Sequence, residues 1–134
     1  MRCHVGKVCE ELREEDIVMS LMIQRGREMI RINTQKNTIE YSTSNGLNWN
    51  TRYSSGSCGT FYDLFDNGRE ILACTSKGVY YSNNEGLNWN CRYSSGACGT
   101  FMQLSSDGRY LYATTSQGLY YSSSNGLNWN KRSW

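Results

Sequence analysis

The chain has 134 residues, a length that fits one domain. Its formal net charge of +2 is too small to indicate a surface for nucleic acid or anionic membranes. No apolar run reaches the length of about 18 residues that a membrane-spanning helix needs, and no secretory leader is visible. We therefore expect a cytoplasmic protein with neither nucleic-acid nor membrane partners.

The first 15 residues differ in composition from the rest of the chain. Residues 9–16 read CEELREED, and Glu, Leu and Arg favour helix. We expect a linker with a short helical turn here; the competing prediction is a helix that continues to about Met22. Cys3, His4 and Cys9 suggest a metal site, but they do not complete a four-ligand set. We expect no metal and no cofactor.

Residues 16–50 show short strand patterns separated by turns. The segment DIVMSLMI at 16–23 predicts a first strand, and the segment RGREMI at 25–30 opens a second one after a turn. A third strand is expected at 39–42, after a turn at 33–38. We expect 16–50 to form a first, diverged sheet.

Residues 51–90 give the clearest strand pattern. TFYDLF at 60–65 alternates in polarity, Asp-Asn-Gly at 66–68 is a hairpin signal, and REILACT at 69–75 is the next strand. Two further strands are expected at 79–82 and 89–93. Four short antiparallel strands in about 40 residues are typical of a β-propeller blade.

The same order of elements returns in residues 91–134. Segments 41–80 and 81–120 align without a gap, with about 24 of 40 positions identical. Such a period indicates a repeat architecture in which each unit buries its apolar face against its neighbours. We predict an all-β domain of three four-stranded antiparallel blades, with blade 1 at 16–50, blade 2 at 51–90 and blade 3 at 91–134.

One eight-residue motif occurs three times, at 42–49, 82–89 and 122–129, and we call these segments the box turns. They read STSNGLNW, SNNEGLNW and SSSNGLNW. The motif resembles the Asp-box (BNR) motif, Ser-x-Asp-x-Gly-x-x-Trp, of sialidase-like and other β-propellers. The position of the family's Asp is taken here by Ser44, Asn84 and Ser124. Short polar side chains can still hydrogen-bond the backbone two residues on, so we expect the turn to form.

The resemblance implies a fold rather than an activity, because the family's motif is a folding device remote from the ligand site. Glycine tolerates positive φ, serine caps the turn and tryptophan supplies apolar area between blades. The residues expected in this structural role are Ser42, Gly46, Trp49, Ser82, Gly86, Trp89, Ser122, Gly126 and Trp129.

Three blades do not close a ring, because known propellers use about four to eight. An open array leaves apolar sheet faces in water. Two chains give six blades around a twofold axis, and sialidase-like propellers are also six-bladed, so we expect a homodimer. The alternative is an open three-blade unit that docks on another protein.

Repeat-equivalent arginines and tyrosines are the candidate ligand-binding residues: Arg52, Arg92, Arg132, Tyr53 and Tyr93. Sialidases use an arginine cluster for a carboxylate, and guanidinium groups suit bidentate binding. Identical placement in each blade equally favours local salt bridges within the scaffold. The sialidase-type set of nucleophilic Tyr, Glu and acid/base Asp is not found, so we expect no enzyme activity.

The six cysteines are expected to be reduced, since no secretory signal is visible and Cys58 and Cys98 occupy equivalent repeat positions. Our functional prediction is a non-catalytic interaction module, self-assembled and binding a protein partner. The alternatives are a lectin-like glycan binder, with Asn48, Asn88, Asn128, Asn50, Asn90 and Asn130 as candidate polar contacts, and a degenerate sialidase-like hydrolase.

Overall fold

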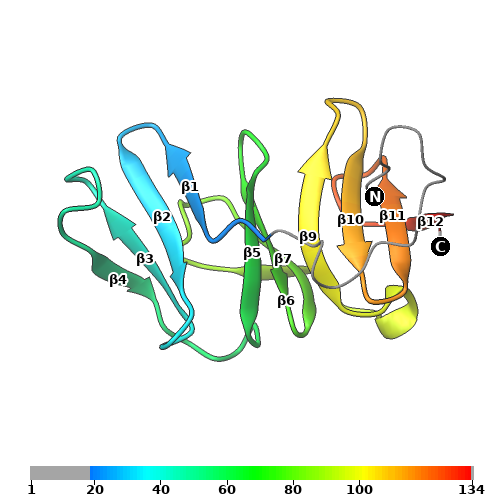
Figure 1. Ribbon diagram of the computed structural model, residues 1–134, viewed down its shortest axis with the longest axis horizontal. Coiled ribbons are helices and arrows are strands. Elements are labelled where there is room, and N and C mark those ends of the chain that lie inside the picture. Colours follow the sequence, from blue (N-terminus) through cyan, green and yellow to red (C-terminus); the bar gives the residue numbers. More distant parts are fainter. Residues whose placement is uncertain (1–18, 134) are drawn as a thin grey trace, which may run out of the picture.

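The computed structural model describes residues 19–133, which form three four-stranded antiparallel sheets that follow one another along the chain (Figure 1). The first sheet holds β1 (Met22–Arg25), β2 (Glu28–Asn33), β3 (Thr38–Ser42) and β4 (Asn50–Tyr53). The second holds β5 (Phe61–Asp66), β6 (Ile71–Thr75), β7 (Gly78–Ser82) and β8 (Asn90–Tyr93). The third holds β9 (Phe101–Ser106), β10 (Leu111–Thr115), β11 (Gly118–Ser122) and β12 (Asn130–Ser133). A 3-10 turn, η2 (Gly96–Cys98), precedes β9.

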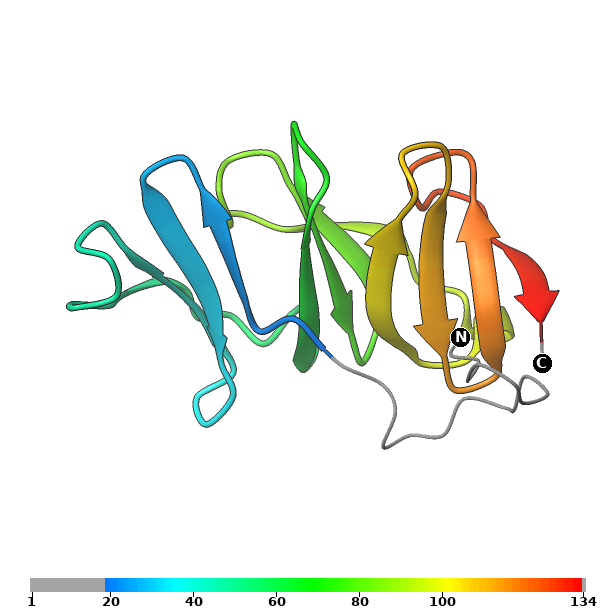
Figure 2. The same cartoon turned by 45° about the horizontal axis from the view of Figure 1, so that its top comes forward.

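Adjacent sheets meet at their first strands. The N–H of Leu64 in β5 donates to the carbonyl of Ser20, just before β1, at 2.8 Å. The N–H of Leu104 in β9 donates to the carboxylate of Asp63 in β5 at 3.0 Å. The sheets stand side by side as separate layers (Figure 2). The expected all-β fold of four-stranded, propeller-like sheets is confirmed.

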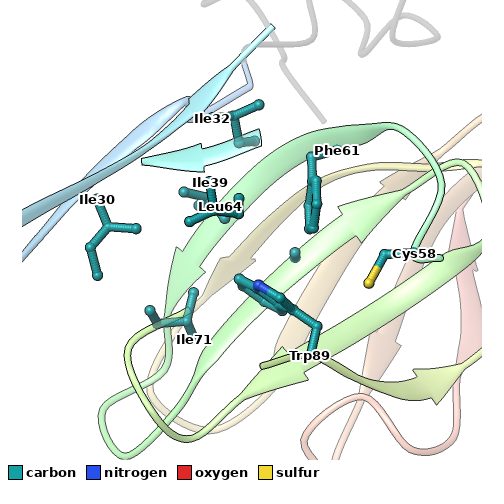
Figure 3. Packing of buried hydrophobic residues seen from close by; sticks show 9 residues of the cluster. Ile30, Ile32, Ile39, Cys58, Phe61, Leu64, Ile71 and Trp89 are labelled. Atoms are coloured by element: carbon teal, nitrogen blue, oxygen red, sulfur yellow. The ribbon is translucent and has the colours of Figure 1, made fainter. Parts of the chain in front are cut away.

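The apolar core lies between the sheets. Between the first and second sheets, Ile30, Ile32 and Ile39 of one sheet pack against Phe61 and Trp89 of the other (Figure 3). The second interface repeats this arrangement with the following residues: Leu72, Cys74, Val79, Phe101, Leu104, Leu111, Ala113 and Tyr120. Because side chains alternate along a strand, the second sheet uses one face for the first sheet and the other face for the third.

The sheet boundaries differ from those expected. Strands β4 and β8 pair with β3 and β7, so the first two sheets end at Tyr53 and Tyr93, after the expected boundaries at 50/51 and 90/91. The box turn is thus a hairpin inside a sheet, and the loop to the next sheet comes after the fourth strand.

The strand expected at 16–23 is corrected within the described residues, because β1 begins at Met22; positions 16–18 lie outside them. Before it, Leu21 accepts a hydrogen bond from Ile32 while Ser20 already pairs with the second sheet. The chain therefore leaves the ladder of its own sheet at this point. The helical turn at 9–16 and the Cys3, His4 and Cys9 group lie outside the described residues. Residues 19–133 contain no helix with the length and apolar character to cross a bilayer.

Candidate interaction surfaces

The box turns share one hydrogen-bonding pattern. In the second turn the Ser82 hydroxyl accepts the N–H of Gly86 at 2.9 Å, and the Trp89 Nε1–H donates to the carbonyl of Gly86 at 3.0 Å. The side chain of Asn84 accepts the N–H of Asn88 at 2.9 Å. The first and third turns use the residues Ser42, Ser44, Gly46, Trp49, Ser122, Ser124, Gly126 and Trp129 in the same way. Serine or asparagine thus takes the place of the family's aspartate as the acceptor.

Each box turn has a left-handed residue before its glycine. Asn45, Glu85 and Asn125 have φ values of 57°, 64° and 56°. The backbone hydrogen bond inside each turn goes to the carbonyl of the residue before it, namely Ser44, Asn84 or Ser124. In the second and third turns the carbonyl of the left-handed residue itself accepts an arginine from the preceding sheet.

Arg52 and Arg92 are these arginines. The guanidinium of Arg52 binds both oxygens of Glu28 at 2.7 and 2.8 Å and donates to the Glu85 carbonyl at 3.0 Å. The guanidinium of Arg92 binds both oxygens of Glu70 at 2.8 and 2.9 Å and donates to the Asn125 carbonyl at 2.7 Å. Their hydrogen bonds hold the pKa of Glu28 and Glu70 below the ordinary value. Both arginines therefore join one sheet to the next.

Arg132 has a different environment. Tyr110 stands where Glu28 and Glu70 stand in the other sheets. The Arg132 guanidinium lies 5.5 Å from the ring centre of Tyr112 and 5.8 Å from that of Tyr121. The ring centres of Tyr110 and Tyr121 are 5.5 Å apart. We call Tyr110, Tyr112, Tyr121 and Arg132 the trailing end of the array.

The opposite face of the array belongs to the first sheet, and we call Arg31, Glu40, Trp49 and the box turn 42–49 the leading end. Arg31 pairs with Glu40 at 2.8 Å and lies 3.9 Å above the Trp49 ring. Burial alone would raise the pKa of Glu40, but hydrogen bonds from Arg31 and Asn33 outweigh it and lower the pKa. In the other two sheets, the positions of Arg31 and Glu40 are taken by an alanine and a tyrosine.

A charged groove lies between the first two sheets, on the side of their β1–β2 and β5–β6 hairpins. It consists of hollows of about 560 and 400 Å³ that share Glu28 and Glu85. Arg25 crosses it, bonded to Glu85 at 2.8 Å and to Asp66 at 2.6 Å. The other lining residues are Gln24, Gly26, Tyr41, Thr51, Arg52, Gly68, Asn84 and Leu87.

Leucine at the same place in each box turn is exposed. The exposed fractions are 80% for Leu47, 52% for Leu87 and 56% for Leu127. Leu87 lines the charged groove beside Tyr41 and Arg52 of the preceding sheet, which accounts for its greater coverage. Leu47 belongs to the first sheet of the chain, and no earlier sheet of residues 19–133 covers it.

The rings of Tyr53 and Tyr93 pack against core residues and do not line one shared pocket. Each ring makes an edge contact with a phenylalanine, with centre separations of 6.1 Å to Phe61 and 5.7 Å to Phe101. The Tyr93 hydroxyl is 3.5 Å from Cys98 Sγ; this hydrogen bond, with burial, raises the pKa of Tyr93. The candidate residues of different repeats therefore do not come together. Arg52 and Tyr53 lie in the first sheet, Arg92 and Tyr93 in the second, and Arg132 in the third.

Asp63 is a functional candidate that the sequence did not single out. Its side chain is fully buried in β5 and accepts the backbone N–H groups of Ser20 and Leu104. Burial raises its pKa to about 7, against the opposing effect of those two hydrogen bonds. The only sequence signal was an acid at a strand position where the neighbouring repeats have Leu21 and Gln103.

Cys58, Cys74, Cys91 and Cys98 are free thiols, as expected for the described part of the chain. Burial raises the pKa of Cys74 well above its ordinary value, so this thiol stays protonated. Within residues 19–133 no three side chains of His, Cys, Asp or Glu gather as ligands for a metal ion.

Comparison with known proteins gives a likeness of fold. No family model and no curated protein sequence matches the chain. An ancestral GH74 enzyme of known structure is 20% identical with a TM-score of 0.52, over 79% of this chain and 18% of that one. The GH74 enzyme of Niastella koreensis is 15% identical with a TM-score of 0.39, over 79% and 24%. The chain thus spans less than a quarter of these enzymes, and the first likeness supports a propeller-like all-β fold alone.

Proposed function

We propose that this protein is a non-catalytic interaction module of the Asp-box type, which assembles as a homo-oligomer and binds a protein partner along its box turns. The observation that carries this proposal is the repeated exposure of Leu87 and Leu127, on the box turns of the second and third sheets. Arginine and tyrosine are enriched at the strongest contacts of protein-binding surfaces, and the buried centre of such a surface is more apolar than its rim. Leu87 lines the charged groove together with Tyr41 and Arg52, which supports binding there.

The state of the carboxylates supports binding over hydrolysis. Within residues 19–133 every acidic side chain has an internal partner. Five are paired with arginine, namely Glu28, Glu40, Asp66, Glu70 and Glu85. Asp107 accepts bonds in its own turn, and Asp63 is fully buried. Glycoside hydrolysis needs an acid and a base or nucleophile free to face the substrate.

Glycan binding is the second candidate, because the exposed asparagines follow the same repeat. Asn48, Asn88 and Asn128 are exposed, as are Asn50, Asn90 and Asn130. Amide side chains suit sugar hydroxyl groups. The degenerate hydrolase remains the third alternative; the GH74 likeness bears on it only through the fold.

The test compares three ligand classes with one purified protein. A phage-displayed peptide library would yield peptides whose affinity falls more than about tenfold in Leu87→Ser, the loss expected for a central contact. The matched control is Gln117→Ser, an exposed residue in the β10–β11 turn, which should bind normally. Selective binding on a glycan array with no peptide selected would favour the second candidate. Cleavage of a fluorogenic sialoside, abolished by Arg92→Ala, would favour the third.

A further inference from the structure

The two interfaces inside the chain are copies of one joint. In each, an arginine of the fourth strand of one sheet donates to the left-handed box-turn residue of the next, from Arg52 to Glu85 and from Arg92 to Asn125. Each arginine also stacks on a tyrosine of its own sheet, 3.7 Å from the Tyr41 ring and 4.1 Å from the Tyr81 ring.

The two ends of the array hold the arginine and the carbonyl of a third such joint, without the glutamate that binds the arginine in the other two, because Tyr110 stands in its place. At the trailing end, Arg132 follows β11 as Arg52 follows β3, beside Tyr121, the equivalent of Tyr41. At the leading end, Asn45 has the same left-handed conformation as Glu85 and Asn125. Donor and acceptor therefore stand at opposite ends of one chain.

We propose that the trailing end of one chain docks on the leading end of a second copy, with Arg132 donating to the Asn45 carbonyl of that copy and Leu47 covered by the joint. Two such contacts close a ring of two chains and six blades. A head-to-tail contact forms a ring when its rotation closes, and a third chain would give nine blades, beyond the usual four to eight. This inference rests on the self-assembly in the proposed function and is independent of the partner.

Leu47 shows what the joint would cover. Leu87 and Leu127 lie on box turns that face a preceding sheet of the same chain, and they are 52% and 56% exposed. Leu47 occupies the same place with no preceding sheet within residues 19–133, and it is 80% exposed. A second copy would bring Leu47 toward the exposure of its two equivalents.

The leading and trailing ends both carry polar side chains where the inner sheets have apolar ones. Tyr112 of the trailing end takes the place of Leu72, which faces the third sheet. At the leading end, the Arg31–Glu40 pair takes the place of an alanine–tyrosine pair. The Tyr112 hydroxyl, which donates to Asp107, would therefore meet an ion pair across the joint as an acceptor, and buried polar groups need such partners. Solenoid caps also have polar outer faces, which gives the competing outcome of the test.

The first experiment is light scattering of the full chain on a sizing column. We expect twice the chain mass of 15.4 kDa. Arg132→Glu and Leu47→Asp should each weaken the dimer more than about tenfold, the loss expected at central contacts, and leave thermal unfolding of the monomer unchanged. Lys131→Glu, in the same strand and exposed, is the matched control and should remain dimeric.

Mixing the two monomeric variants tests the head-to-tail geometry. A heterodimer of Arg132→Glu with Leu47→Asp keeps one intact joint, so the mixture should regain dimers that neither variant forms alone. Wild-type protein at the mass of one chain would overturn the proposal and make the end sheets caps. A dimer that survives either single substitution would overturn the head-to-tail contact. A mass above two chains would overturn the two-chain ring.

Discussion

The carboxylate of Asp63 accepts the backbone N–H of Leu104 at 3.0 Å, across the boundary between the second and third sheets. Its other oxygen accepts the N–H of Ser20, beside the first sheet. A fully buried carboxylate that keeps its charge at neutral pH would need such donors, yet burial raises the pKa of Asp63 to about 7. The folded state therefore binds this proton more tightly than the unfolded chain does.

Stability should fall as pH rises toward neutrality. The pKa of Asp63 is 3.8 in the unfolded chain and about 7 in the folded protein. Its protonation therefore contributes fully to the free energy of unfolding below pH 3.8, and this contribution is lost as pH rises through 7. The free energy of unfolding should drop by up to about 1.4 kcal/mol per pH unit within this window. Urea unfolding at several pH values between 5 and 8 measures the slope.

Two controls isolate this slope. Asp63→Asn removes the titration, so its stability should be flat over the same range, although the new NH₂ group facing a backbone donor lowers it by about 1–3 kcal/mol. His4→Gln in both proteins removes the one histidine, because histidine is the residue type that ordinarily changes charge in this pH range. The lowered pKa values of Glu28, Glu40 and Glu70 give the opposite sign, with stability lost only as pH falls below about 4.5. An Asp63→Asn protein that keeps the wild-type slope would contradict the assignment.

Removing the joint at the second interface should destabilise the chain more than removing an exposed arginine. Arg92→Ala leaves Glu70, which is half-buried, with only the Asn67 amide at 3.3 Å and leaves the Asn125 carbonyl without its arginine donor, and we expect a loss of about 2–3 kcal/mol. Arg69→Ala, at an exposed position, should stay within about 0.5 kcal/mol. A double-mutant cycle with Glu70→Ala gives the coupling energy; a coupling near zero would mean that the pair is held by the fold without stabilising it.

Gly78 should tolerate no side chain. Its φ is 137°, and a Cβ there would lie 2.0 Å from the carbonyl oxygen of Tyr93. Gly78→Ala should cost at least about 3 kcal/mol, seen as a lower thermal midpoint or loss of folded protein. Gly56→Ala is the matched control, because nothing lies within 4 Å of its added Cβ. Equal midpoints for the two variants would refute this reading of the β6–β7 turn.

The box turn should depend on its serine and gain from an acid at the family's Asp position. Ser82→Ala leaves the N–H of Gly86 without its acceptor in a buried place, and we expect a loss of about 1–3 kcal/mol. Asn84 accepts from both Ser82 and Asn88, so Asn84→Asp should strengthen both bonds and add about 0.5–1 kcal/mol. Urea midpoints measure both changes. A destabilised Asn84→Asp protein would show that the turn needs the neutral amide.

The sequence repeat predicted the features that depend on residues close together in the chain. Hairpins, box turns and the order of four strands depend on residues a few positions apart, so their glycines, asparagines and serines identify them. The strands expected at 79–82 and 89–93 already put a box turn between the third and fourth strands of one sheet, which the pairing of β8 with β7 shows. The segment bounds at 50/51 and 90/91 did not follow this strand assignment, since they cut the fourth strands from their sheets.

The ion pairs were harder to foresee. Arg52 and Glu28 are 24 residues apart, and their meeting depends on the registers of two strand pairs. The repeat did carry a signal, since Glu28 and Glu70 occupy equivalent positions ahead of Arg52 and Arg92. Asp63 had no such signal, because its partners are backbone groups of the sheets on either side.

The two hydrogen bonds that Asp63 accepts affect how cooperatively the three sheets unfold. In a stacked array each unit contacts only its neighbours, so terminal units can fray one at a time. Here a single side chain of β5 holds backbone next to β1 and within β9. Unfolding of the first or the third sheet therefore exposes the buried carboxylate of Asp63, which also holds the sheet on the opposite side. Amide hydrogen exchange should show the three sheets opening as one cooperative unit, with Asp63→Asn separating them into steps.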